Sequence, residues 1–293
     1  MYDRVPQPRL DRNWVAPGRS TRDAALLDLA AEILGGGKTS RLYKKLVYDL
    51  EIATKATANN QKQQLMSFYS VTIDAKPGAD RTRVEREMEA VIADFLARPP
   101  SATELERAKT GILARIVRGL EQVGGFYGKA SILAEGALYA DDPGFISVYA
   151  GWIRSATPQE VLAAARAVMN AGYYQLDVLP FPEYKTVASA VDRTTGLPQV
   201  ADTPDLTFPA IEEATLRNGV KVVLARRTTI PVVEISVQFD AGYAADSAAG
   251  GKLGGASFTS AMLDEGTRRR NATQIAEELE NLGATLSTGS TLD

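Results

Sequence analysis

The sequence predicts an α+β protein with two units of mixed or antiparallel sheet packed with helices, the second of them truncated. Three observations favour this class. Apolar residues recur at helical spacing in residues 24–34, 81–97 and 101–121. Strand-like composition marks residues 53–60, 66–76 and 173–179. The chain has 293 residues, of which 45% are hydrophobic and 24% charged, so it is globular and too long for one ordinary core.

Composition excludes several function classes. The net charge is −3, which gives no electrostatic footprint for nucleic acid. With no cysteine, the chain forms neither disulfides nor thiolate metal sites, and it suits an oxidising or a reducing compartment. With no histidine, it forms no ordinary catalytic zinc site and no Ser-His-Asp triad. Aspartates and glutamates are scattered over helix faces, as is typical of solvated surface.

The first twenty residues are polar and rich in proline, and we expect them to form an extended lead-in. They lack the apolar stretch of a signal peptide, so an exported protein would have lost its signal before this point. No run of 18 apolar residues occurs, which predicts no membrane span.

The stretch Leu34–Leu50 predicts a sharp corner between two helices. A glycine triplet ends the first helix, and Ser40 is a cap for the second. Gly37, Lys38 and Thr39 also spell the end of a nucleotide-binding P-loop. That loop requires a glycine at position 32, which is glutamate here, and a preceding strand, where this sequence has helical spacing. A P-loop nucleotide hydrolase is therefore the weaker alternative.

Capping residues predict where the helices of the first unit begin. Thr21 or Asp23 caps the first helix, and Ser101 with Glu104 forms a capping box. Two further helices follow Asp142-Pro143 and Thr157-Pro158, where proline suits the first helical position. With a final strand at 173–179, the first unit closes near residue 180.

Residues 181–209 are rich in proline, threonine and aspartate without periodicity, which predicts a linker between domains. Asn218-Gly219 then predicts a hairpin with a two-residue type I′ turn. After it we expect a strand with an inward apolar face at 233–239, helices at 252–264 and 271–283, and a strand at 285–292 that the chain end interrupts. Residues 210–293 are therefore expected to be a truncated half-domain.

Two stretches, LDLAAEILGGGKTSRLYKKLVYDLEIAT and GGKLGGASFTSAMLDEGTRRRNATQIAEELENLGATLSTGSTLD, resemble the pitrilysin/insulinase peptidases, the inverzincins. The resemblance extends from about Asp23 to Asp293. It implies that residues 1–180 are the second domain of the catalytic half, that 181–209 are the interdomain linker, and that 210–293 begin the first domain of the non-catalytic half.

The zinc motif of that family, His-x-x-Glu-His, is degenerate here. The resemblance aligns Ser257 with the first histidine, Ser260 with the glutamate and Ala261 with the second histidine. A serine hydroxyl is a poor zinc ligand and alanine has no donor atom. As a description of the present helix, close packing of its small residues on a sheet is the favoured explanation, whereas the family resemblance accounts better for its origin.

The family's substrate-binding arginine and tyrosine are also absent, since the corresponding positions are Val47 and Thr54. The resemblance therefore assigns no catalytic, metal-binding or substrate-binding residue to this chain. Arg268–Arg270 is more typical of a solvated turn than of a binding patch.

The resemblance implies a fragment of a zinc-dependent metalloendopeptidase, a hydrolase that cleaves unfolded peptides in an enclosed chamber. This chain alone is expected to be inactive and to hold no cofactor, with zinc belonging to the parent protein. Its expected partners are peptide substrates and the missing parts of that peptidase, in the periplasm. The main alternative is a non-catalytic scaffold, like the inactive subunits of processing peptidases.

Overall fold

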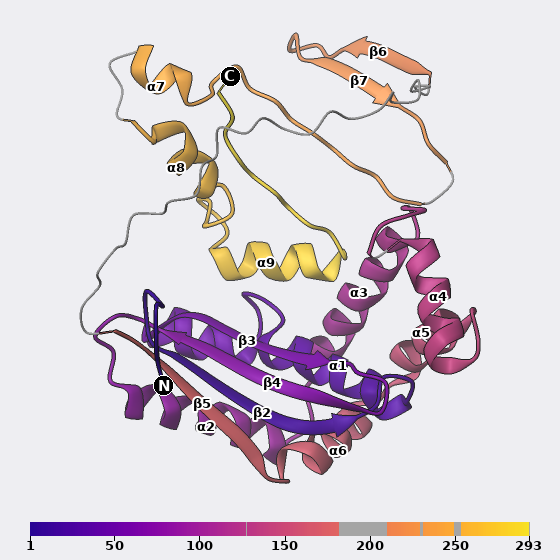
Figure 1. Ribbon diagram of the computed structural model, residues 1–293. Helices are drawn as coiled ribbons and strands as arrows, with labels where there is room; N and C mark the ends of the chain where they lie inside the picture. Colours follow the sequence, from indigo (N-terminus) through magenta and orange to yellow (C-terminus); the bar gives the residue numbers. More distant parts are fainter. Residues whose placement is uncertain (127, 182–209, 229–230, 249–252, 293) are drawn as a thin grey trace, which may run out of the picture. The chain divides into compact units, whose positions relative to one another are not determined.

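The structure is a computed structural model that describes residues 1–126, 128–181, 210–228, 231–248 and 253–292. The chain divides into two compact units. One unit contains Met1–Phe181 together with Ile235–Asp293, and the other contains Pro182–Glu234. A mixed five-stranded sheet and its helices make up most of the first unit, which confirms the predicted α+β class (Figure 1).

The sheet of the first unit has the strand order β1-β5-β2-β4-β3. Neighbouring strands are antiparallel except β1 and β5, which are parallel. The three strands that the sequence predicts are confirmed as β3, β4 and β5. The strands are β1 (Tyr2–Asp3), β2 (Arg9–Pro17), β3 (Ala53–Gln61), β4 (Met66–Ala75) and β5 (Tyr173–Pro180).

The expected extended lead-in at residues 1–20 is wrong, because β2 lies between β4 and β5 inside the sheet. Leu10, Trp14 and Ala16 alternate on one face and are only 2–3% exposed. Arg12 interrupts this apolar alternation and hides the strand in the sequence. Arg12 is nevertheless buried, since its guanidinium forms ion pairs with Glu85 and Glu89 of the helix at Arg81–Ala97.

The helices of the first unit are α1 (Arg22–Gly35), η1 (Tyr43–Asp49), α2 (Arg81–Ala97), α3 (Ala102–Gly119), α4 (Lys129–Ala140), α5 (Phe145–Ser155), α6 (Pro158–Met169), α7 (Ala244–Ala248), α8 (Gly255–Ala261) and α9 (Ala272–Asn281). Of these, α1, α2 and α6 pack against one face of the sheet, whereas α9 contacts α3. Helix α4 was not predicted from the sequence, and α8 is shorter than the helix expected at 252–264.

Most predicted caps are confirmed. Thr21 caps α1, and capping boxes begin α3 at Ser101, α6 at Thr157 and α9 at Asn271. The cap expected at Asp142 is wrong. Its carboxylate accepts a hydrogen bond from the amide of Gly144 at 2.8 Å, so the turn continues and α5 begins two residues later than Pro143.

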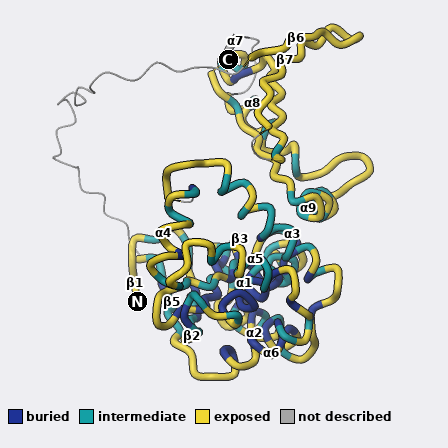
Figure 2. Tube along the Cα trace, turned by 90° about the vertical axis from the view of Figure 1, so that its right-hand side faces the viewer, coloured by how far each residue is buried: buried dark blue, intermediate teal, exposed yellow. Residues whose placement is uncertain are grey.

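The hydrophobic core lies between the sheet and helices α1, α2 and α6 (Figure 1). Tyr69, Val71 and Ile73 of β4 are fully buried on this side. The buried positions in Figure 2 concentrate in the same strands and helices. Helix α1 has 14 residues, and all of them are buried except Arg22, Asp23, Asp28 and Glu32, which places the helix at the centre of the unit.

The glycine corner ends α1 as predicted, with Gly36 at its C-cap. The second helix, η1, is a π-helix rather than the expected α-helix, and the amide of Leu50 donates to the carbonyl of Lys45 at 3.1 Å. Because Gly37, Lys38 and Thr39 follow a helix and not a strand, the backbone arrangement of a P-loop is missing at this corner.

The second unit contains the predicted hairpin, formed by β6 (Ile211–Thr215) and β7 (Lys221–Ala225). Its turn differs from the expected type I′. The amide of Gly219 donates to the carbonyl of Leu216, and Gly219 has a φ of 88°. This is the geometry of a three-residue loop with a glycine bulge. The linker expected at 181–209 falls almost entirely outside the described residues.

The strands expected at 233–239 and 285–292 do not form within the described residues. Val237 and Phe239 are 69% and 76% exposed, so the apolar face predicted to point inward has no partner there. A strand is stable only when a neighbouring strand satisfies its backbone groups. Helix α9 ends before Gly283, as predicted.

Candidate functional site

Strand β3 ends the sheet, so one of its edges faces no other described strand. Helix α1 contacts it very closely at Gly35. A Cβ atom on Gly35 would lie 2.0 Å from the backbone nitrogen of Ala58, and only glycine permits this approach. The end of α1 is therefore fixed against the middle of β3.

Two cavities adjoin this strand. The first, about 570 Å³, is lined by residues 54–59 of β3, the glycine corner and Tyr43. The second, about 880 Å³, is lined by residues 58–60 and by side chains of α1, α3, α4 and α5. Ala58 and Asn59 line both cavities, so together they form one groove, which we call the β3 groove.

An ion pair lies where the two cavities meet. The guanidinium of Arg115 on α3 donates to both carboxylate oxygens of Glu32 on α1, at 3.2 and 2.6 Å. Both residues line both cavities. Burial lowers the pKa of Arg115, but its hydrogen bonds to Glu32 and the charge of that carboxylate outweigh burial and leave the pKa raised. The groove thus has a fixed pair of opposite charges at its centre.

A second polar cluster lies around Asp28 in the larger cavity. Its carboxylate accepts hydrogen bonds from Tyr149 at 2.6 Å, Lys62 at 2.7 Å and Asn60 at 3.0 Å. Burial and the charge of Asp28 raise the pKa of the Tyr149 phenol, which stays protonated. Close by, the hydroxyl of Tyr69 is buried and has no hydrogen-bond partner among the described residues.

The sheet face opposite the core carries polar pairs beside exposed apolar side chains, since Val15 is 57%, Met66 52% and Phe68 43% exposed. Three pairs of residues that lie directly opposite each other on β2 and β4 bond across this face. They are Arg9 with Asp74 at 2.7 Å, Asp11 with Thr72 at 2.7 Å, and Asn13 with Ser70 at 2.5 Å. These pairs satisfy the polar groups of their part of the face without covering helices.

The residues at the family's two substrate-binding positions have different surroundings. Thr54 lines the smaller cavity and its hydroxyl accepts a hydrogen bond from Gln7 at 2.5 Å. Val47 is partly buried against the core and lines neither cavity. The two positions therefore do not line a common cavity.

The degenerate zinc-motif positions all lie on α8. Ser257 and Ala261 are exposed, and the Ser260 hydroxyl donates to the carbonyl of Gly289 at 3.2 Å. Two hydroxyls and a methyl group do not fit Zn²⁺, which requires imidazole, thiolate or carboxylate donors. Across the described ranges, no group of three or more aspartates and glutamates could hold a metal ion.

Sequence reasoning did not find the β3 groove. The signals available were the alternating small residues Ala56 and Ala58 and the glycine triplet, which together indicate a helix end lying on a strand.

None of the helices in the described parts of the chain is long and apolar enough to cross a membrane.

One family model matches part of the chain. Residues 2–112 match the family model described as the peptidase M16 inactive domain. Among curated proteins, no relative matches the chain.

Solved structures share the fold at low identity. The inactive peptidase domain of a candidate zinc protease from Bordetella parapertussis is 21% identical, with a TM-score of 0.54 over 65% of this chain and 99% of its own. A protease from Helicobacter pylori is 17% identical, with a TM-score of 0.54 over 61% of this chain and 43% of its own. The periplasmic protease PqqL from Escherichia coli is 13% identical, with a TM-score of 0.51 over 62% and 20%.

These identities establish a common fold alone, and the chain spans less than half of the Helicobacter pylori protease. The family model rests on the residues that form β1 to β4, the glycine corner and most of α3. The match over residues 2–112 and the shared fold support a fragment related to the inactive domain of the peptidase M16 family, the pitrilysin/insulinase peptidases.

Proposed function

We propose that this chain is a non-catalytic part of a zinc-dependent metalloendopeptidase, and that it holds unfolded peptides in extended form along β3. The β3 groove carries this proposal. It places an unpaired strand edge beside two cavities that together extend along most of the strand.

An unpaired strand edge binds an extended peptide through main-chain hydrogen bonds, which do not depend on the peptide's sequence. Side chains on one side of such a peptide would enter the two cavities. The apolar walls of the larger cavity, which include Ile112 and Ile116, suit apolar side chains, and the Glu32–Arg115 pair suits polar ones. This arrangement favours unfolded chains of mixed sequence.

The sheet face opposite the core supports the same role. A chamber wall must contact water and unfolded peptide, and this face offers both polar pairs such as Arg9–Asp74 and exposed apolar side chains such as Val15 and Phe68. We place zinc and the general base in another part of the parent peptidase, since Ser257, Ser260 and Ala261 do not fit the metal. That part and the peptide substrate are the proposed partners.

We also propose that residues 1–180 form the second domain of the catalytic half, with a linker at 181–209. Residues 210–293 would then begin the first domain of the non-catalytic half. The exposed apolar side chains at Ile235, Val237 and Phe239, 82%, 69% and 76% exposed, support an incomplete sheet. The periplasmic location described for PqqL supports the same compartment for this protein.

Binding of fluorescein-labelled casein peptides to the purified chain tests the proposal. Asn59→Trp fills the junction of the two cavities and should weaken binding at least about tenfold, which corresponds to about 1.4 kcal/mol. Gln61→Trp places the same side chain on the same strand, outside both cavities, and should leave affinity unchanged. Mass spectrometry should find the peptides uncleaved.

Equal affinity of Asn59→Trp and the parent chain would contradict the groove. If casein peptides do not bind at all, the result would favour the alternative role, a scaffold that contacts other protein subunits.

A further inference from the structure

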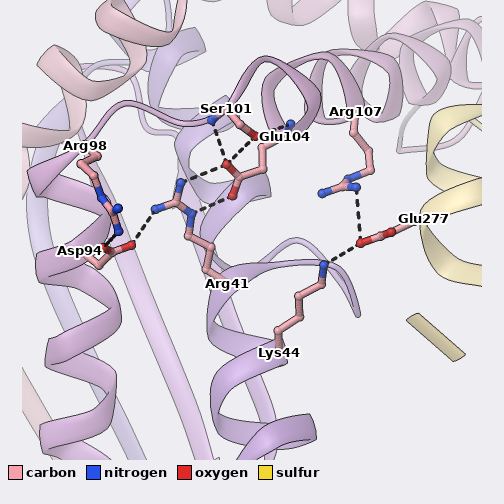
Figure 3. A network of polar contacts seen from close by, with 8 residues as sticks. All are labelled: Arg41, Lys44, Asp94, Arg98, Ser101, Glu104, Arg107 and Glu277. Atoms are coloured by element: carbon pink, nitrogen blue, oxygen red, sulfur yellow. Dashed lines mark hydrogen bonds and ion pairs between the residues drawn. The ribbon is translucent and has the colours of Figure 1, made fainter. Parts of the chain in front are cut away.

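A cationic surface lies beside the glycine corner, formed by Lys38, Lys44 and Arg107. The first two follow the glycine triplet and the third lies on α3. Figure 3 shows Lys44 and Arg107 pointing toward the same carboxylate, that of Glu277 on α9. Only 11% of the Arg107 side chain is exposed, so its charge is strongly shielded from water.

All ion pairs that these three cations form among the described residues are with residues 264–280. Lys44 lies 2.6 Å from Glu277. Arg107 lies 3.8 Å from Glu277 and 3.4 Å from Glu280. Lys38 bonds to Asp264 at 2.9 Å and to Glu265 at 2.8 Å. Lys38, Lys44 and Arg107 therefore have their charge partners in one distant stretch of sequence.

The corner and α3 also contact α9 and the residue that follows it closely. Arg118 donates to the carbonyl of Gly283 at 2.6 Å, and a Cβ atom on Gly283 would lie only 2.9 Å from the Cβ of Ala114. At the corner, the carboxylate of Glu280 lies 3.2 Å from where a Cβ of Gly37 would be. Residues 107, 114 and 118 share one face of α3, so the contact extends along the helix.

Apolar burial contributes little to this contact. Helix α9 has no buried residue and contributes none to the hydrophobic core. Charge pairs with partly exposed side chains are weak individually and are screened by salt. A helix held mainly by such pairs is releasable without unfolding the sheet and α1.

We propose that the surface of Lys38, Lys44 and Arg107 is a docking site for an acidic helix with carboxylates three residues apart, and that α9 of this chain is its reversible occupant. This inference goes beyond peptide binding at β3 and does not depend on it.

The absence of cysteine allows a direct distance measurement in the full chain. Glu106→Cys on α3 and Asn281→Cys on α9, both exposed, provide the only two sites for spin labels. Double electron–electron resonance spectroscopy should give one narrow distribution of distances between the two spin labels at about 0.1 M salt. The docked population should fall about tenfold at about 1 M salt, where the Debye length is about 3 Å.

Charge reversal distinguishes docking from general destabilisation. Reversing the acidic side with Glu277→Lys and Glu280→Lys should lower the docked population about tenfold. Adding Lys44→Glu and Arg107→Glu, which reverses the cationic side as well, should restore it. Glu278→Lys is the matched control, because Glu278 pairs with Arg270 and not with the corner. It should leave the distance unchanged.

A narrow distance that survives the acidic reversal, or that the combined reversal fails to restore, would overturn the proposal. Dilution of labelled chains with unlabelled ones tests the identity of the occupant. Loss of the short distance on dilution would mean that α9 docks on a second copy, which would overturn its assignment to the same chain.

Discussion

The guanidinium of Arg41 forms two parallel hydrogen bonds to the carboxylate of Glu104, at 2.8 and 3.0 Å (Figure 3). The pair joins the glycine corner to the start of α3, where the same carboxylate also accepts from the backbone amide of Ser101 at 2.9 Å. One side chain thus completes a capping box and anchors the corner. Bidentate pairs of this kind are stronger than ordinary surface ion pairs.

Arg41→Met should lower the free energy of unfolding by about 2 kcal/mol, because it leaves the half-buried Glu104 without its main partner. Arg98→Met is the control. Arg98 pairs with Asp94 at the surface and is 74% exposed, so its loss should cost less than about 0.5 kcal/mol. Urea denaturation at neutral pH measures both, and equal losses would contradict the anchoring role.

The same pair predicts a dependence on pH. Burial raises the pKa of Glu104, but Arg41 and Ser101 outweigh burial and lower it from 4.5 to about 2. As the pH falls, Glu104 is therefore protonated in the unfolded chain before it is protonated in the folded chain. The stability that ionised Glu104 contributes is complete above pH 4.5 and is lost as the pH falls toward 2. Between these two pH values, the free energy of unfolding measured by denaturation should fall less in Arg41→Met than in the parent chain.

Gly35→Ala should destabilise the fold by about 3 kcal/mol, since the added methyl would collide with the backbone of Ala58. Gly151→Ala is the matched substitution in α5, where nothing lies within 4 Å of the new methyl. It should stabilise by about 0.5–1 kcal/mol, because alanine favours helices over glycine. Thermal unfolding followed by circular dichroism tests both. A neutral Gly35→Ala would contradict the close contact of α1 with β3.

Glu51 has a φ of 50°, which is strained for a residue with a side chain. Glu51→Gly should therefore raise the free energy of unfolding by about 0.5–1 kcal/mol. Glu51→Ala removes the same exposed carboxylate but keeps the strain, so it should have little effect. If alanine stabilises as much as glycine in denaturant titrations, the gain comes from charge and not from backbone conformation.

The phenols of Tyr69 and Tyr149 differ in their hydrogen bonds. Tyr149→Phe should lower the free energy of unfolding by about 2 kcal/mol, because its hydroxyl donates to the charged Asp28. Tyr69→Phe removes a buried hydroxyl without a partner among the described residues and should stabilise by about 1 kcal/mol. A loss of stability in Tyr69→Phe would show that a buried water satisfies this hydroxyl.

Local patterns in the sequence predicted most of the first unit. The caps at Thr21, Ser101 and Thr157 act within a few residues, so they are readable without tertiary context. Strand β2 was not predicted, because Arg12 is buried through partners that lie far away in the sequence, on α2 and β5. Burial of a charge depends on contacts that no local pattern contains.

The candidate site was harder to predict than the fold. The β3 groove arises where α1, α3 and a sheet edge meet, and residues as distant as Asn59 and Arg115 line it together. The expected strand at 233–239 has a clear alternating pattern and remains exposed, since alternation does not provide the partner that a strand requires.

Hydrogen exchange of the full chain with casein peptide tests the central claim, peptide binding at the edge of β3, most directly. The account predicts slower exchange of amides in residues 53–61, no change in the amides of β1, and peptide that remains intact. A peptide with N-methylated backbone amides, which cannot form the main-chain hydrogen bonds, should give no protection. Unchanged exchange in β3 at saturating casein peptide, or cleavage of the peptide by the chain alone, would contradict the account.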